Sequence, residues 1–192
     1  GILTVYINTK GNNKGGKNEL ISFDAGLREN MVPQDATAIF TSEEAEQIEK
    51  DFYDFVEVSP ITGTIKVVDD QVTIEVGGKD AHGIAPELGV NSGTYFASFL
   101  NRYSFSGDAK NYLQLTAEYL HEDTKAEKLA LDYIDDVMGD LTMNSGVFTF
   151  TPENGGVIAV NIRFPKGVTP EGIEIKMESK LAEYGVTLSR GK

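Results

Sequence analysis

Few side chains in this sequence combine the chemistry and the setting that catalysis requires. The chain has two histidines, His82 and His121, and no cysteine. Neither histidine has a second histidine or a suitably spaced carboxylate that would complete a metal-binding motif. The sequence also lacks a nucleophile elbow, a phosphate-binding loop and a dinucleotide-binding glycine motif. It therefore predicts no complete catalytic centre within these 192 residues.

The segment at residues 77–91 is the best candidate for a functional loop. It surrounds His82 with glycines and has no apolar periodicity, so this histidine suits an exposed loop better than a packed core. A functional histidine and one that is merely exposed fit this pattern equally well. His121 precedes Glu122 and Asp123 at the expected end of a helix, where a cation is favoured, and is interpreted as structural or simply exposed.

Alternating apolar and polar residues predict short strands in the first and last parts of the chain. In the first strand Leu3, Val5 and Ile7 share one face, and an Asn/Gly/Lys-rich loop follows at residues 11–17. The strands are expected at residues 3–7, 20–23, 37–40, 65–67, 72–76, 147–150, 156–164 and 186–189. The pair that precedes the histidine loop has a short acidic turn between its members and reads as a hairpin.

Helical spacing replaces this alternation in three places. A capping box of Thr41 and Glu44 starts the first helix, whose apolar residues run to Phe55. Residues 92–138 carry three apolar stripes, the last formed by Leu129, Leu131 and Ile134. The third helix begins at Thr169-Pro170, with proline at its first position, and stops at Gly185.

The order strand, helix, strand thus occurs twice, on either side of a helical segment. This order predicts an α+β fold of two ferredoxin-like α/β sandwich halves, each an antiparallel sheet with helices on one face. The expected divisions are residues 1–91 for the first subdomain with the histidine loop, 92–138 for the helical connecting segment and 139–192 for the second subdomain.

Charge and hydropathy restrict the partners and the compartment. The net charge is −13, with acidic residues spread along the whole chain, so the surface should repel nucleic acid. No stretch approaches the roughly 20 apolar residues of a membrane helix, and no basic region marks the N-terminus as a signal peptide. Together with the absence of cysteine, these features lead us to expect a cytoplasmic protein without membrane or nucleic-acid partners.

Three motifs resemble the lid domain of the aminoacylase and dipeptidase metallopeptidases, and most closely the dipeptidase V type. The first is Gly-Lys-Asp-Ala-His-Gly at residues 78–83, followed by Pro86 and by Gly-Val-Asn at 89–91. The others are the stretch at residues 26–33 that ends in Asn-Met-Val-Pro and the strand Asn-Ile-Arg-Phe-Pro at 161–165. The motifs occur in the expected order across nearly the whole chain.

The resemblance implies a division of labour between two domains. In such enzymes a separate catalytic domain holds two divalent metal ions, zinc or manganese, while the inserted lid closes over the dipeptide substrate. None of the catalytic domain's motifs is present here, so the chain is interpreted as the lid alone, made of two lid subdomains. It should bind no cofactor and hydrolyse no dipeptide without its own catalytic domain.

The resemblance also implies roles for three residues. His82 matches the lid histidine that polarises the scissile carbonyl and stabilises the oxyanion, a task suited to an imidazole N–H. Asn30 and Arg163 match groups that hold the substrate near its carboxylate end, and a guanidinium can bind a carboxylate through two parallel bonds. Alternatively, Asn30 simply precedes a turn, and Arg163 pairs with a neighbouring acid on its sheet.

The predicted function is therefore the lid of a cytoplasmic metallo-dipeptidase of the Xaa-Xaa or β-Ala-Xaa type. Two alternatives remain open at this point. One is the lid or dimerisation domain of an amino-acid or diaminopimelate deacylase, which shares the histidine and arginine motifs. The other is a non-enzymatic, ferredoxin-like binding or dimerisation module.

Overall fold

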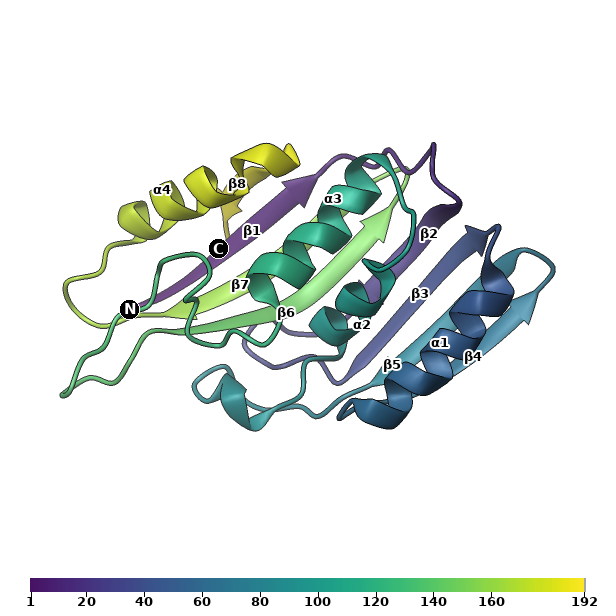
Figure 1. Ribbon diagram of the computed structural model, residues 1–192. Helices are drawn as coiled ribbons and strands as arrows, with labels where there is room; N and C mark the ends of the chain where they lie inside the picture. The colour runs from purple at the N-terminus through teal and green to yellow at the C-terminus, as the bar shows by residue number, and fades with distance from the viewer. Residues whose placement is uncertain (192) are drawn as a thin grey trace.

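One antiparallel sheet runs through the whole molecule. In the computed structural model, which describes residues 1–191, eight strands pair in the order β4-β5-β3-β2-β6-β7-β1-β8 (Figure 1). Their bounds are β1 Ile2–Thr9, β2 Asn18–Ala25, β3 Asp35–Ser42, β4 Thr62–Val68, β5 Gln71–Gly77, β6 Thr142–Thr151, β7 Gly155–Arg163 and β8 Thr187–Arg190. All eight strands, including the hairpin of β4 and β5, lie where the alternation predicts them.

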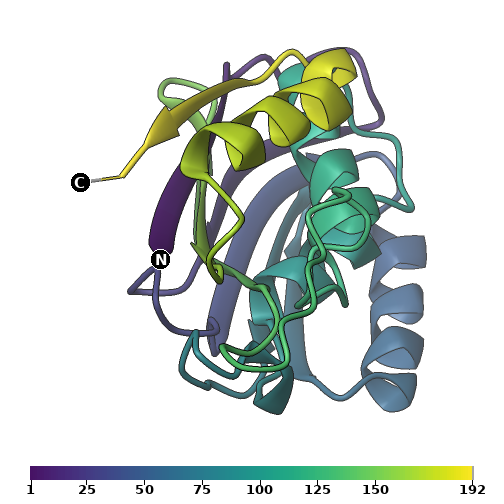
Figure 2. The same cartoon turned by 90° about the vertical axis from the view of Figure 1, so that its left-hand side faces the viewer.

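Four α-helices cover one face of this sheet, as the two views show (Figure 1, Figure 2). They are α1 Ala45–Val58, α2 Ser92–Leu100, α3 Gly107–Leu115 and α4 Pro170–Leu181, with short helical turns at η1 Pro86–Leu88, η2 Thr116–Leu120 and η3 Ala182–Tyr184. The α+β class, with antiparallel strands and helices on one face, is confirmed. No helix in residues 1–191 is both long enough and apolar enough to cross a bilayer.

The helix α4 shows why the local predictions succeeded. The Thr169 hydroxyl accepts a hydrogen bond from the Gly172 N–H at 3.0 Å, and Pro170 occupies the first helical position. After a short η3 turn the chain reverses at Gly185, whose φ of 65° lies in the left-handed region that favours glycine. Both ends of the helix are thus specified by adjacent residues.

The two halves share a single continuous sheet. Strand β2 joins β6 through the pairs from Phe23–Phe150 to Ala25–Phe148. Strand β1 lies between β7 and β8, so the N-terminal strand is paired with the last third of the chain. The division into subdomains at residues 91 and 139 stays a prediction.

The segment after η2 is not helical, contrary to the third apolar stripe. Residues 121–141 form successive turns, with Ala126 and Ala130 at φ 57°. The Asp123 carboxylate accepts hydrogen bonds from the Glu127 and Lys128 N–H groups, which closes a turn and competes with a helix. The expected helical connecting segment therefore ends at η2.

The capping box at Thr41 is also wrong. Thr41 belongs to β3, where it pairs with Gln71 of β5, and helix α1 begins at Ala45. The Ser42 hydroxyl instead accepts a hydrogen bond from the Glu44 N–H at 2.9 Å. The strand continues past the expected boundary because pairing with β5 provides hydrogen-bond partners for its backbone N–H and C=O groups there.

The core lies between the sheet and its helices. Phe23 of β2 contacts three aromatic rings from three other elements, Phe96 of α2, Tyr112 of α3 and Phe148 of β6, at centroid distances of 5.4 to 6.0 Å. Because β2 and β6 join the two halves, this cluster packs across their junction. Removing one such buried aromatic ring typically costs about 3–5 kcal/mol.

Candidate functional site

A row of polar side chains crosses three strands on the face that the helices leave uncovered. Thr4 of β1, Asn161 of β7 and Asn144 of β6 are in register with one another. All three are buried, because the loops that follow β2 and β5 pack over them. Ala159, which shares this face of β7 with Asn161, is also only 4% exposed. This face is therefore a second, polar layer of packing.

The loop at residues 26–34 carries Asn30, which is half-buried. The carboxylate of the preceding Glu29 accepts hydrogen bonds from the Thr4 hydroxyl at 3.2 Å and the Tyr6 hydroxyl at 3.3 Å. The negative charge of Glu29 raises the pKa of Tyr6, so the phenol stays a donor. Asn161 in turn donates to the Thr4 hydroxyl at 3.2 Å. This network ties the loop to the polar row.

The loop that carries His82 packs directly against the Asn30 loop. The Gly83 N–H donates to the Asn30 carbonyl at 2.7 Å, and the Val32 N–H donates to the Ala81 carbonyl at 2.8 Å. A side chain at Gly83 would place its Cβ 3.0 Å from the Asn30 oxygen and 3.2 Å from Asn161 Oδ1. A side chain at this position would therefore push the two loops slightly apart.

The ring of His82 is exposed and oriented by its own loop. The Ile84 N–H donates to Nδ1 of His82 at 3.1 Å. A neutral imidazole that accepts at Nδ1 carries its proton on Nε2. Within residues 1–191, Nε2 of His82 has no hydrogen-bond partner. The ring thus presents a free N–H donor to a ligand.

Arg163 ends β7 as a half-buried cation. Its Nε atom is enclosed without a hydrogen-bond partner, and the guanidinium forms no ion pair with any acid in residues 1–191. The alternative in which Arg163 pairs with a neighbouring acid is therefore wrong. Arg163 and Asn30 line one open hollow of about 790 Å³.

Other cations at this hollow behave differently. Arg190 of β8 also lines it, but its guanidinium pairs with Glu174 at 2.5 Å and Glu171 at 3.2 Å. Arg28 is exposed at the rim. Arg163 thus combines partial burial with a free guanidinium, a combination that favours binding of an external anion.

The structure places Asn30 and Arg163, which are far apart in sequence, at one hollow, whereas His82 does not line it. Asn30 and Arg163 share the hollow, and His82 lies on the loop bonded to the Asn30 backbone. The sequence analysis missed Asn144 and Glu29, which hold the Asn30 loop. Asn144 lies outside the strand expected at residues 147–150 and has polar neighbours such as Thr142 and Ser145, so the sequence offered no distinct signal for it.

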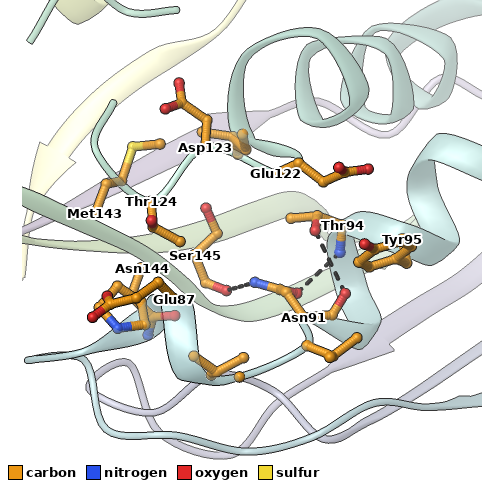
Figure 3. Close-up of a pocket in the computed structure, with 15 residues that line it drawn as sticks. Glu87, Asn91, Thr94, Tyr95, Glu122, Asp123, Thr124, Met143, Asn144 and Ser145 are labelled. Carbon is orange, nitrogen blue, oxygen red and sulfur yellow. Dashed lines mark hydrogen bonds between the residues drawn. The ribbon is translucent and has the colours of Figure 1, made fainter. Parts of the chain in front are cut away.

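A separate cavity of about 210 Å³ is lined by residues 143–145 of β6 (Figure 3). This part of the strand lies before residues 148–150, which pair with β2. Asn91 caps α2 here by accepting from the Thr94 N–H at 3.0 Å, and its amide donates to the Ser145 carbonyl. The Asp123 carboxylate is used within its own turn. These bonds engage Asn91 and Asp123 in local packing, whereas the buried Ser145 hydroxyl has no hydrogen-bond partner in residues 1–191.

The described chain does not supply a metal centre. In residues 1–191, no three His, Asp or Glu side chains are grouped so that they could hold a metal ion. His121 has both ring nitrogens engaged, at 3.1 Å from the Thr94 hydroxyl and at 2.9 Å from Glu122. Within residues 1–191, neither His82 nor His121 therefore belongs to a metal-binding cluster.

Comparison with known proteins identifies relatives of one kind. Over 175 residues the chain is 34% identical to proteins named "Putative dipeptidase" from Staphylococcus aureus strains MRSA252, MW2 and USA300. Each alignment covers 91% of this chain but only 37% of the relative. The resemblance to dipeptidases is thus confirmed, and the chain corresponds to a part of these longer proteins. No family model matches the chain.

Among solved structures, aminoacylhistidine dipeptidase from Vibrio alginolyticus matches with a TM-score of 0.37 and 10% identity. The match covers 99% of this chain and 44% of that protein. At such a TM-score it adds nothing to the assignment.

Proposed function

We propose that this chain is the lid of a cytoplasmic, metal-dependent dipeptidase of the Xaa-Xaa or β-Ala-Xaa type. The observation that carries the proposal is Arg163, a half-buried guanidinium without an acidic partner at an open hollow. Arg28 and Arg102 also form no ion pair within residues 1–191, but both are exposed, whereas Arg163 is half-buried. A dipeptide's terminal carboxylate fits this donor and the Asn30 amide, which lines the same hollow.

His82 acts at the scissile peptide bond and not at the carboxylate end of the substrate. Its Nε2–H donates to the oxygen of the scissile carbonyl, where negative charge develops in the transition state. The bond from Ile84 fixes the ring's tautomer before substrate arrives, so the donor needs no rearrangement. Asn30 and Arg163 hold the carboxylate end while His82 contacts the reacting carbonyl.

The two divalent metal ions of such an enzyme supply the activated water that attacks the peptide bond. The resemblance assigns them to a separate catalytic domain, and residues 1–191 contain no group of three His, Asp or Glu side chains that would hold a metal ion. This chain's own contribution is binding and orientation of the substrate and donation of one hydrogen bond.

The test uses the full-length protein that contains this chain, with Arg163→Met as the variant. We expect kcat/KM for a dipeptide to fall about 10²-fold or more, because a buried charged hydrogen bond to the carboxylate is lost. For the corresponding dipeptide amide, which has no terminal carboxylate, the loss should stay within about threefold. A large loss of kcat/KM for the dipeptide with a small loss for its amide would identify the carboxylate as the group that Arg163 binds.

Arg102→Gln is the matched control, because it removes one positive charge at a site where Arg102 stacks on Phe55 and Phe99. It should affect both substrates little. Equal losses for dipeptide and amide in Arg163→Met would contradict the proposed role. Hydrolysis of N-acyl amino acids in place of dipeptides would identify a deacylase, and hydrolysis of neither would favour a binding module.

A further inference from the structure

Asn144 lies beneath the two loops of the site and contacts neither the hollow nor its opening. We propose that Asn144 is a positioning residue, which holds Asn30 for substrate binding and, through the Asn30 backbone, holds His82 for catalysis. The inference rests on the proposed function of Asn30 and His82. Asn144 itself touches no substrate, because the hollow shared by Asn30 and Arg163 does not include it.

The side-chain amide of Asn144 bonds to both neighbours of Asn30. Its Nδ2 donates to the Glu29 carbonyl at 3.0 Å and to the Met31 carbonyl at 2.9 Å. Asn144 is only 2% exposed, so water cannot readily replace either bond. One amide group therefore fixes the peptide units 29–30 and 31–32, which flank the unit that contains the Asn30 carbonyl.

The loop rests directly on β6 at this point. A Cβ on Gly146 would lie 2.5 Å from the Glu29 oxygen, and one on Gly26 would lie 1.9 Å from the Gly146 oxygen. The ladder between β6 and β7 shifts register here, between Ser145 and Val147. This bulge lets the loop approach until the Asn144 amide can reach both carbonyls.

The same contact extends to the histidine loop. The Asn30 carbonyl, held between the two bonded peptide units, accepts the Gly83 N–H at 2.7 Å. Thr142 of β6 also donates to the Gly83 carbonyl, at 3.4 Å. His82 immediately precedes Gly83, so a shift of the Asn30 loop moves the ring of His82 as well.

The experiment is a double-mutant cycle in the full-length protein. Asn144→Leu keeps a side chain of similar size but leaves the two carbonyls without their donor. We expect kcat for a dipeptide to fall about tenfold, because small displacements of a catalytic group carry large rate penalties. In a His82→Ala background the same substitution should lower kcat less than about twofold, because its effect acts through His82.

A purely structural role would lower kcat by the same factor in both backgrounds, and this result would overturn the inference. Thr149→Val is the matched control, on an exposed position of the same strand, and should leave kcat and KM unchanged. Should Asn144→Leu fail to fold, as judged by thermal unfolding, Asn144→Ser takes its place, since its short hydroxyl cannot bridge both carbonyls.

The cycle also separates this inference from the proposed function. If His82→Ala alone leaves kcat unchanged, the proposed function fails and the positioning role fails with it. If His82→Ala lowers kcat but Asn144→Leu and Asn144→Ser do not, only the positioning role is wrong.

Discussion

His82 lies in the loop that precedes α2 and His121 packs against the first turn of α2, but their ring nitrogens are used differently. The His82 loop runs into α2, and its ring is exposed with one nitrogen engaged by the Ile84 N–H. The side chain of His121 is 12% exposed, contacts the Thr94 hydroxyl and Glu122, and packs edge-on against a tyrosine ring at 4.4 Å.

The difference lies in unused bonding capacity. The local structure fixes the orientation of His82 while leaving its Nε2–H without a partner, whereas it engages both nitrogens of His121. Burial also lowers the pKa of His121, which keeps that ring neutral inside the protein. The first arrangement suits interaction with a ligand, and the second suits packing.

The largest expected effect is on catalysis by the full-length protein. His82→Ala should lower kcat for a dipeptide about 10²–10³-fold with little change in KM, because its donor acts on charge that appears in the transition state. Steady-state kinetics provide the measurement. His121→Ala is the matched control, and a kcat for His82→Ala within about threefold of the unsubstituted protein would remove the distinction between the two histidines.

The second effect is on stability, where we expect substitution of His121 to have the larger effect and substitution of His82 the smaller one. His121→Ala should lower the free energy of unfolding by about 1–3 kcal/mol, because an aromatic contact and a partly buried hydrogen bond are lost. His82→Ala should change it by less than about 0.5 kcal/mol, as expected for an exposed side chain. Urea denaturation of this chain measures both. Equal destabilisation would show that the His82 loop is also a structural element.

A smaller effect should follow from Gly83→Ala, which leaves both histidines in place. The added Cβ would meet the Asn30 carbonyl at 3.0 Å, so the two loops must separate slightly. We expect kcat to fall about three- to tenfold, corresponding to roughly 1 kcal/mol of barrier. Gly172→Ala in α4 is the control and should not affect kcat. An unchanged kcat in Gly83→Ala would mean that the loop contact does not determine the position of His82.

The smallest effect concerns pH. Because burial lowers the pKa of His121 in the folded state below its ordinary value of 6.5, the unfolded chain binds more protons between these two values. His121 should therefore reduce stability as pH falls from about 6.5 towards its lowered pKa, and contribute no further pH dependence above that range. The measurement is the pH dependence of the stability difference between the unsubstituted chain and His121→Ala. That difference should shrink on acidification, and one that grows would contradict the assignment.

Local patterns succeeded where neighbouring residues decide the structure. The hairpin of β4 and β5 follows from alternation around a tight turn, and α4 follows from its threonine cap and first-turn proline. The apolar spacing at Leu129 and Leu131 failed, although both residues are buried. They reach the core from a series of turns held by Asp123, and spacing alone cannot distinguish the two arrangements.

The sequence by itself determined the α+β class, an exposed loop around His82 and three motifs that resemble those of dipeptidases. Only the tertiary structure decided that β1 pairs with β7 and that Asn144 and Asn161 form a buried polar row beneath two loops. It also showed that Arg163 has no acidic partner within residues 1–191. The physical reason is that local propensity specifies each element, whereas bonding partners depend on which distant backbone and side-chain groups meet when the sheet assembles.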